Sequence, residues 1–64
     1  MREKVMIINY KVYLIDRETG KIGYIADTYM GNDIEQGKID LMLKHTDEDY
    51  IARVRFHSIQ CFEF

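Results

Sequence analysis

The chain has 64 residues, of which 47% are hydrophobic and 31% are charged, and its formal net charge is −2. A chain of this length forms one domain and buries only about 60% of its unfolded surface, so a deep catalytic cleft is not expected. Domains that bind nucleic acid are usually basic, and the acidic balance argues against a general attraction to DNA or RNA. We therefore expect a single non-enzymatic domain over residues 1–64.

Membrane-spanning segments and cross-links through cysteine, such as disulfides or zinc clusters, are not expected either. The longest apolar run, Val5 to Ile8, has four residues, whereas about 20 are needed to cross a bilayer. No secretory signal pattern follows that run. Cys61 is the only cysteine, so no disulfide forms within the chain and no zinc cluster is built on thiolates. We expect a cytoplasmic protein.

The first expected element is a long strand over residues 5–15, which is rich in Val, Ile, Tyr and Leu. Ile8 and Tyr10 share one side of it, because side chains alternate between the two faces of a strand. The other side also carries apolar residues, among them Ile7 and Tyr13. The strand therefore either bends so that its halves serve two sheets, as barrel strands do, or has one side covered by a partner.

A hairpin turn over residues 16–21 and a second strand over residues 21–29 are expected next. Gly20 suits the turn because glycine adopts a positive φ at little cost. Gly23, inside the second strand, predicts a bulge or the close approach of another backbone. Residues 30–37 contain Gly, Asn and Asp and predict an exposed loop.

Two further strands joined by an acidic turn are expected in the last third of the chain. Residues 38–44 alternate apolar and polar side chains, which predicts a strand with Ile39, Leu41 and Leu43 inward. A turn at residues 46–49 leads to a fourth strand over residues 50–57. Its inward row is expected to be Tyr50, Ala52, Val54 and Phe56, and its outward row Ile51, Arg53, Arg55 and His57.

The order of these elements resembles the SH3-like small β-barrel. Gly20-Lys21-Ile22-Gly23-Tyr24-Ile25 resembles the Gly-x-x-Gly-x-Ile entry to the second strand in ribosomal-type and other SH3-like modules. Residues 54–63 resemble the ending in which a short helical turn leads to a closing fifth strand. The resemblance covers nearly the whole chain and implies an all-β fold, either a single five-stranded SH3-like barrel or a strongly bent antiparallel sheet. Because many unrelated functions share this fold, it implies no activity.

The chain also departs from the best-known members of that fold. It lacks the Ala-Leu-Tyr-Asp-Tyr start, the paired tryptophans and the proline of signalling SH3 domains, so a polyproline-binding groove is not implied. The sequence pattern of Sm-type RNA-binding rings is missing as well. No functional residue is carried over from either family.

No arrangement of residues predicts catalysis or a bound metal. His57 and Cys61 lie four apart with Glu63 nearby, but a metal site needs three or four convergent ligands and a nucleophilic cysteine needs a positioned base. The acidic residues 47–49 lack the spacing of a calcium loop. Gly20 to Gly23 is too short for a phosphate loop. We expect no catalytic, cofactor-binding or metal-binding residue.

The preferred interpretation is a small binding module that acts through protein–protein contacts, such as an inhibitor or adaptor of the kind mobile elements encode. Five tyrosines in so short a chain favour it, because tyrosine is enriched at interfaces. Acidic residues of the loop and hairpin would set its electrostatic preference, and a homodimer through the first strand is a secondary expectation. The candidate protein interface consists of Tyr10, Tyr13, Tyr24 and Tyr29.

The alternative is a nucleic-acid-binding small β-barrel that uses a basic outward strand face. Small barrels bind single strands by stacking bases on aromatic side chains above a basic groove. Outward strand positions are also commonly charged for solubility, so the pattern has a purely structural interpretation as well. The candidate nucleic-acid face consists of Lys11, Arg53, Arg55 and His57.

Overall fold

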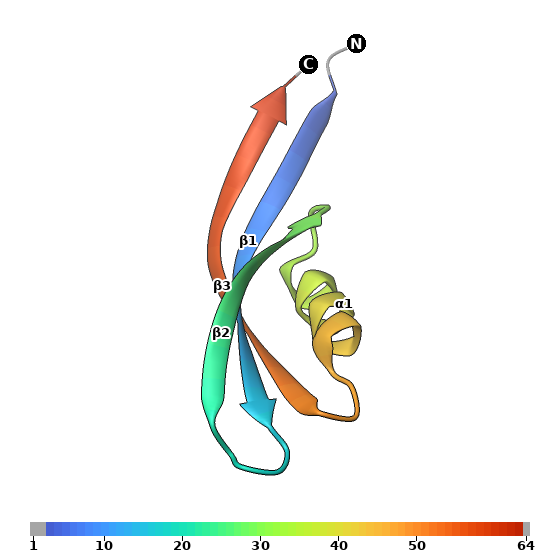
Figure 1. The fold of residues 1–64 in the computed structure, drawn as a ribbon. Helices are drawn as coiled ribbons and strands as arrows, with labels where there is room; N and C mark the ends of the chain where they lie inside the picture. Colours follow the sequence, from blue (N-terminus) through green and yellow to red (C-terminus); the bar gives the residue numbers. More distant parts are fainter. Residues whose placement is uncertain (1–2, 64) are drawn as a thin grey trace.

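The computed structural model describes residues 3–63, which form three strands and one helix. In chain order these are β1 (Lys4–Asp16), β2 (Ile22–Met30), α1 (Ile34–His45) and β3 (Tyr50–Glu63). All strands belong to one antiparallel sheet with the order β2-β1-β3, so the first strand is the central one. β2 and β3 form the two outer edges of this sheet (Figure 1).

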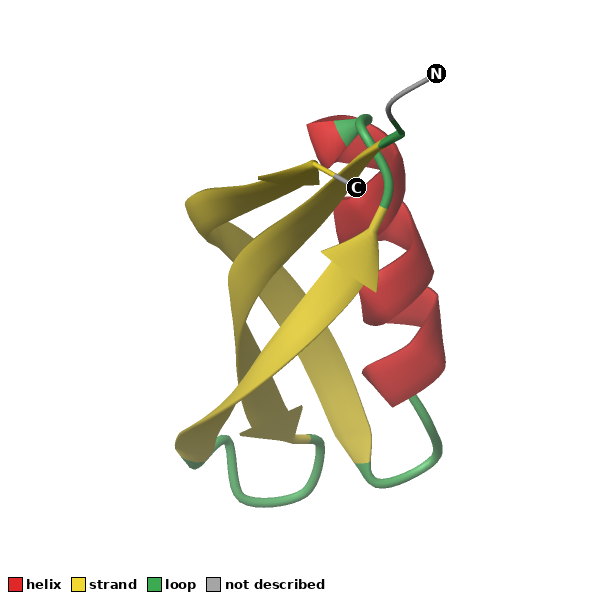
Figure 2. Ribbon diagram, turned by 90° about the horizontal axis from the view of Figure 1, so that it is seen from above, coloured by secondary structure: helices red, strands yellow, loops and turns green. Residues whose placement is uncertain are grey.

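The molecule has two layers, a twisted sheet and a single helix packed on one of its faces (Figure 2). The helix lies beside the half of the sheet where all three strands run together (Figure 1). Beyond it, the start of β1 and the end of β3 continue as a two-stranded ribbon, which makes the molecule elongated, with a longest extent of 51 Å. Within residues 3–63, no element covers the sheet face opposite α1 (Figure 2).

A small core lies between the helix and the central strand. Ile8 and Tyr10 of β1 pack with Leu41 of α1, and all three side chains are buried. Val12 and Ala52 are buried on the same side of the sheet. Burying a large apolar side chain contributes roughly 1.5 to 3 kcal/mol, so this cluster holds the two layers together.

A glycine lets α1 approach the sheet closely. A Cβ atom at Gly37 would meet the Tyr10 hydroxyl, and it would lie 2.8 Å from Tyr29 Cδ2. The Tyr10 hydroxyl donates a hydrogen bond to the Ile34 carbonyl oxygen at 2.6 Å. Burial of this side chain, followed by the nearby charges of Glu35 and the other acidic groups, raises the pKa of Tyr10, so the hydroxyl stays a donor. The contact fixes where the helix begins relative to β1.

The ends of α1 are capped by residues suited to those positions. The Asp33 side chain accepts a hydrogen bond from the Gln36 N–H at 3.1 Å and so satisfies one of the free donors of the first turn. Glu35 lies in the first turn and Lys44 and His45 in the last, which favours the helix dipole at both ends.

Asp27 of β2 ties the sheet to the end of α1. Its Oδ2 accepts hydrogen bonds from His45 Nε2 at 2.6 Å and from Lys44 Nζ at 3.1 Å. Its Oδ1 accepts one from the Thr28 N–H at 2.7 Å. Partial burial alone would raise the pKa of this carboxyl, but the bonds from His45, Thr28 and Lys44 together outweigh that effect and lower the pKa to about 2.

The strand predicted at residues 38–44 is wrong, because this segment is the second half of α1. Leu41 is buried, whereas Ile39 is 46% exposed and Leu43 is 68% exposed, although a strand would have put all three on one face. Leu, Met and Lys dominate the segment, and these residues favour helices. The sheet also needs an apolar layer over Ile8 and Tyr10, and a helix that places Leu41 there supplies it.

The five-stranded SH3-like barrel is also wrong for residues 3–63, which form an open three-stranded sheet. The mainly β class and the antiparallel pairing are confirmed. The short helical turn expected near the end is replaced by a bulge within a continuous β3. Asn9 pairs with Ser58 and Tyr10 with Phe56, so His57 is the extra residue.

The strand predictions for the other segments are confirmed in outline. β1 and β2 lie close to their predicted ranges and are joined by a turn in which Gly20 has a φ of 73°. In β3, Ala52 is buried and Val54 half-buried on the helix side, as predicted, while Tyr50 and Phe56 of the same row are exposed. No bulge occurs at Gly23, since the pairing of β1 with β2 has a single unbroken register.

Candidate nucleic-acid interface

The uncovered face of the sheet, called the open face below, is made by alternate residues of each strand. Its members are the odd residues 7–15 of β1 and the even residues 22–30 of β2. In β3 they are the odd residues 51–55 and, after the bulge, the even residues 58–62. The bulge residue His57 borders the same face.

Charge is segregated between the two faces of the sheet. Within the described strands, the residues that point to the open face include three basic side chains and no acidic one. The acidic residues of the described chain lie on α1 or at its N-cap, in the two turns, at or just before the strand ends, or at Asp27, whose carboxylate is bonded to Lys44 and His45. The net charge of −2 therefore coexists with a basic open face. The three cations of that face are Lys11, Arg53 and Arg55.

Two tyrosines and a lysine meet at the centre of this face. Tyr13 of β1 lies directly opposite Tyr24 of β2, and their ring centroids are 6.3 Å apart with an interplanar angle of 56°. Lys11 Nζ lies 3.9 Å from the centroid of the Tyr24 ring and 5.4 Å from that of Tyr13. Such cation–π contacts at exposed sites contribute about 0.5 to 1 kcal/mol each. The Tyr24 side chain is still 66% exposed.

Two arginines of β3 extend the group on the other side of β1. Arg53 lies opposite Tyr13, and Arg55 lies opposite Lys11. Within residues 3–63, neither arginine forms an ion pair, and Lys11 forms none either. Like charges directly opposite one another destabilise a sheet, so the pairing of Lys11 with Arg55 is expected to be unfavourable by itself.

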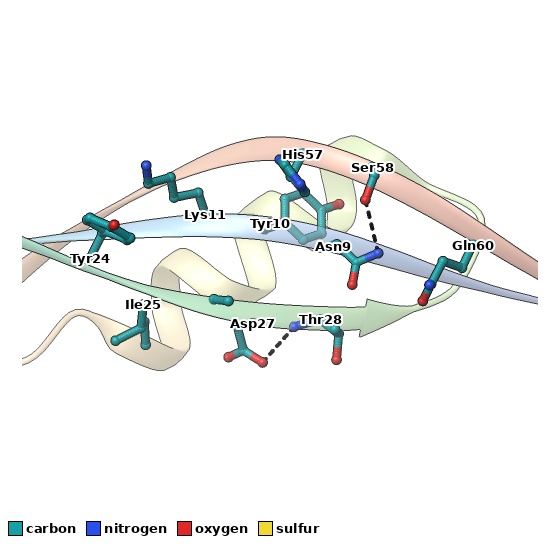
Figure 3. A pocket seen from close by; sticks show the side chains of 11 residues that line it. Asn9, Tyr10, Lys11, Tyr24, Ile25, Asp27, Thr28, His57, Ser58 and Gln60 are labelled. Atoms are coloured by element: carbon teal, nitrogen blue, oxygen red, sulfur yellow. Dashed lines mark hydrogen bonds between the residues drawn. The ribbon is translucent and has the colours of Figure 1, made fainter.

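Next to this cluster the open face is hollowed into a shallow depression of about 600 Å³. Lys11 and Tyr24 lie side by side at one end, and Asn9, Ser58 and Gln60 lie toward the other (Figure 3). Asn9 Nδ2 donates a hydrogen bond to Ser58 Oγ at 3.2 Å. Amide and hydroxyl groups of this kind both donate and accept hydrogen bonds, which suits them to the edges of bases.

The structure brings together residues that the sequence divided between two surfaces. Tyr13 and Tyr24, from the candidate protein interface, share the open face with Lys11, Arg53, Arg55 and His57, the whole of the candidate nucleic-acid face. Tyr10 and Tyr29 lie on the other side of the sheet, where Tyr10 is buried and Tyr29 is half-buried against the core. The four tyrosines therefore do not form one surface.

Sequence reasoning missed the polar half of the site. Asn9 follows the same two-residue period as Lys11 and Tyr13, so the alternation of the first strand was a sufficient signal for it. Ser58 and Gln60 were hidden by the bulge at His57, which shifts the side on which every later residue of β3 lies.

Other site chemistry is limited in the part of the chain that the structure describes. Residues 3–63 contain no group of three His, Cys, Asp or Glu side chains that could hold a metal ion. Cys61 is a free, exposed cysteine. No helix in these residues is long and apolar enough to cross a membrane.

Comparison with known proteins supplies no function by analogy. No family model, no curated protein and no solved structure matches this chain. A function must therefore be inferred from the residues of the open face and their geometry.

Proposed function

We propose that this chain binds single-stranded nucleic acid on the open face of its sheet. The observation that carries the proposal is the direct opposition of Lys11 and Arg55, without an acidic partner, beside the exposed ring of Tyr24. Two cations that face each other without an acidic partner are explained if they bind phosphates. An aromatic ring beside them is explained if it stacks a base.

Each part of the cluster has a role in this binding. Tyr24 and Tyr13 offer rings on which successive bases stack, and such stacking contributes about 1 to 3 kcal/mol per base. Arg53 and Arg55 form a row along β3 that follows the phosphates, and a guanidinium forms two parallel hydrogen bonds to one phosphate. Lys11 lies between the rings and the arginines, within reach of both kinds of group.

The distribution of acidic residues supports single strands over duplexes. Acidic turns close one end of the face, where Asp16, Glu18, Glu48 and Asp49 lie together. A rigid duplex laid along the basic row would run into this negative end, whereas a flexible single strand can turn away from it. Exposed bases are also available for stacking only in single strands.

The test is a titration of fluorescently labelled oligothymidylate, oligouridylate and duplex DNA, followed by anisotropy at several salt concentrations. We expect affinity for the single strands to fall with salt, with a slope of log K against log salt of about −0.7 per phosphate contact. Arg53→Glu should weaken binding and make the slope shallower. Lys38→Glu makes the same charge change on α1, away from the open face, and should have little effect. Absence of binding at the lowest salt, or equal losses in the two variants, contradicts the proposal.

A protein-binding module remains the second candidate. The observation that favours it is the exposure of large apolar side chains at the ends of the open face, where Ile22 is 65% and Met30 is 71% exposed. Apolar side chains of this size on a small domain often mark a protein contact. If oligonucleotides fail to bind while Ile22→Lys or Met30→Lys abolishes self-association or capture of a partner, this second function is the better one.

A further inference from the structure

The outer edge of β2 offers a regular row of backbone groups. Two backbone hydrogen bonds mark the ends of its pairing with β1. The Gly31 N–H donates to the Met6 carbonyl oxygen at 3.0 Å, and the Asp16 N–H donates to the Lys21 carbonyl oxygen at 2.9 Å. Hydrogen-bonded pairs alternate along an antiparallel ladder, and the β1–β2 register is unbroken. The odd residues of β2 therefore bond to β1, and the N–H and C=O groups of its even residues, 22–30, point outward.

The edge of β2 is open to another strand except at Thr28, whose N–H donates to Asp27 Oδ1 at 2.7 Å. Of the features that usually protect a free edge, β2 lacks lysine, arginine, proline and a bulge. Its one charged residue, Asp27, faces the helix and is bonded to Lys44 and His45. The other edge of the sheet differs, because β3 carries two arginines and the bulge at His57.

The sequence of β2 is matched to itself in one antiparallel register. With Ala26 on the two-fold axis, all nine residues of β2 overlap with those of a second copy. Ala26 then faces its own counterpart, Tyr24 faces Thr28, and Ile22 faces Met30. The smallest of these side chains lies at the axis, and the exposed side chains of Ile22 and Met30 cover each other. No charged residue lies opposite another.

We propose that two copies of the chain associate through β2 in this register and form one six-stranded antiparallel sheet. Each outward-facing pair exchanges two hydrogen bonds, except the pairs with Thr28, whose N–H already donates to Asp27 Oδ1. The dimer is a separate proposal from nucleic-acid binding, because it is inferred from the free edge of β2 and not from the residues of the open face. It joins the two open faces into one surface, with a Tyr24 and a Lys11 on either side of the axis.

Self-association through the first strand was expected from the sequence. β1 is the central strand and is paired on both edges from Ile7 to Ile15, so a long free edge is offered by β2 and not by β1. The interface formed by a nine-residue edge is small for a permanent dimer, so the fraction of dimer should depend on protein concentration over the micromolar range.

The experiment is sedimentation equilibrium of the full chain without nucleic acid, from low micromolar to millimolar concentration. We expect the native chain to approach twice its mass of 7.7 kDa. Ala26→Lys places two ammonium groups across the axis, and Ala26→Pro removes only an outward N–H, so both should stay monomeric with unchanged far-ultraviolet circular dichroism. Gln60→Lys adds the same charge to the open face of β3 and should still dimerise.

A cysteine at the axis tests the register itself. In a Cys61→Ser background, Ala26→Cys should form a disulfide-linked dimer under mild oxidation, because paired Cα atoms across two strands lie about 5.5 Å apart. Gln60→Cys in the same background should not. A native chain that stays monomeric at the highest concentration, or an Ala26→Lys variant that dimerises like Gln60→Lys, overturns the proposal. Because these experiments contain no nucleic acid, a monomeric result would contradict the dimer and would leave the outcome of the oligonucleotide titration unaffected.

Discussion

Lys11 Nζ lies 3.9 Å from the centroid of the Tyr24 ring, so a positive charge and an exposed aromatic face are held side by side at the centre of the sheet. The two residues come from adjacent strands, and the pairing of Tyr13 with Tyr24 fixes their separation. In the proposed function, this pair would offer a charge to a phosphate and a ring to a base.

Replacement of Tyr24 by Ala should weaken binding of oligothymidylate by about 1 to 3 kcal/mol, because one stacking ring is lost. Stability should change little, since the side chain is mostly exposed. Tyr24→Phe keeps the ring and should bind nearly as well as the native chain. Anisotropy titrations of the three proteins under one salt condition provide the measurement, and equal affinities for Ala and Phe at this position would contradict the stacking role.

Replacement of Arg55 by Gln should stabilise the free protein while it weakens binding. Arg55 lies opposite Lys11, and removal of one of two like charges in a cross-strand pair should raise the free energy of unfolding by about 0.2 to 1 kcal/mol. Urea unfolding at low salt measures it, and the gain should shrink as salt screens the repulsion. Lys38→Gln is the control, because Lys38 lies 4.0 Å from Glu35 and its loss should give no gain. A destabilised Arg55→Gln would show that the arginine has a structural role.

Replacement of Gly37 by Ala should lower the free energy of unfolding by about 1 to 3 kcal/mol, because the added methyl group overpacks the contact with Tyr10. Gly23→Ala is the matched control, since a Cβ there has no heavy atom within 4 Å, and it should be neutral or slightly stabilising. Tyr10→Phe removes the atom nearest to the new methyl group, so part of the loss should be recovered in the double variant. Urea unfolding of the four proteins tests the contact, and equal stabilities of the two Gly→Ala variants would contradict it.

Stability should fall in acid through Asp27. Its pKa in the folded protein is about 2, below the usual value of 3.8, so its stabilising effect is complete above about pH 5 and is lost as the pH falls through 2. Such a shift corresponds to about 1 to 2 kcal/mol once solvent screening is considered. Asp27→Asn should therefore be less stable than the native chain at neutral pH, and the difference should disappear near pH 2. Urea unfolding of both proteins across this range is the measurement, and a difference that stays constant with pH would contradict it.

Local sequence patterns were sufficient to predict the strands but not the helix. The alternation of Ala52 and Val54 correctly gave the helix-facing side of β3, whereas apolar residues on both sides of β1 left its buried side, that of Ile8, Tyr10 and Val12, undecided. Residues 38–44 alternate in the same way, yet their fold is decided by packing on the sheet. A signal for the helix was present in Asp33 and Gln36, which form the start of a capped helix.

The candidate site could be predicted residue by residue but not as one surface. Tyr13 and Tyr24 meet Arg53 and Arg55 because of pairings between positions 13 and 24, 13 and 53, and 11 and 55. Such registers join segments far apart in the chain, and no local period specifies them. Tyr13 and Tyr24 therefore share one face with the arginines, whereas Tyr10 and Tyr29 of the candidate tyrosine surface lie on the other face.

The most direct test of nucleic-acid binding on the open face is a ¹⁵N–¹H correlation spectrum of the chain, recorded during titration with a short oligothymidylate at low salt. We predict that chemical-shift changes concentrate on the open face and leave the residues of α1 nearly unchanged. The residues expected to change are Lys11, Tyr13, Tyr24, Arg53 and Arg55. A spectrum that does not respond, or changes that concentrate on α1 instead, would contradict it.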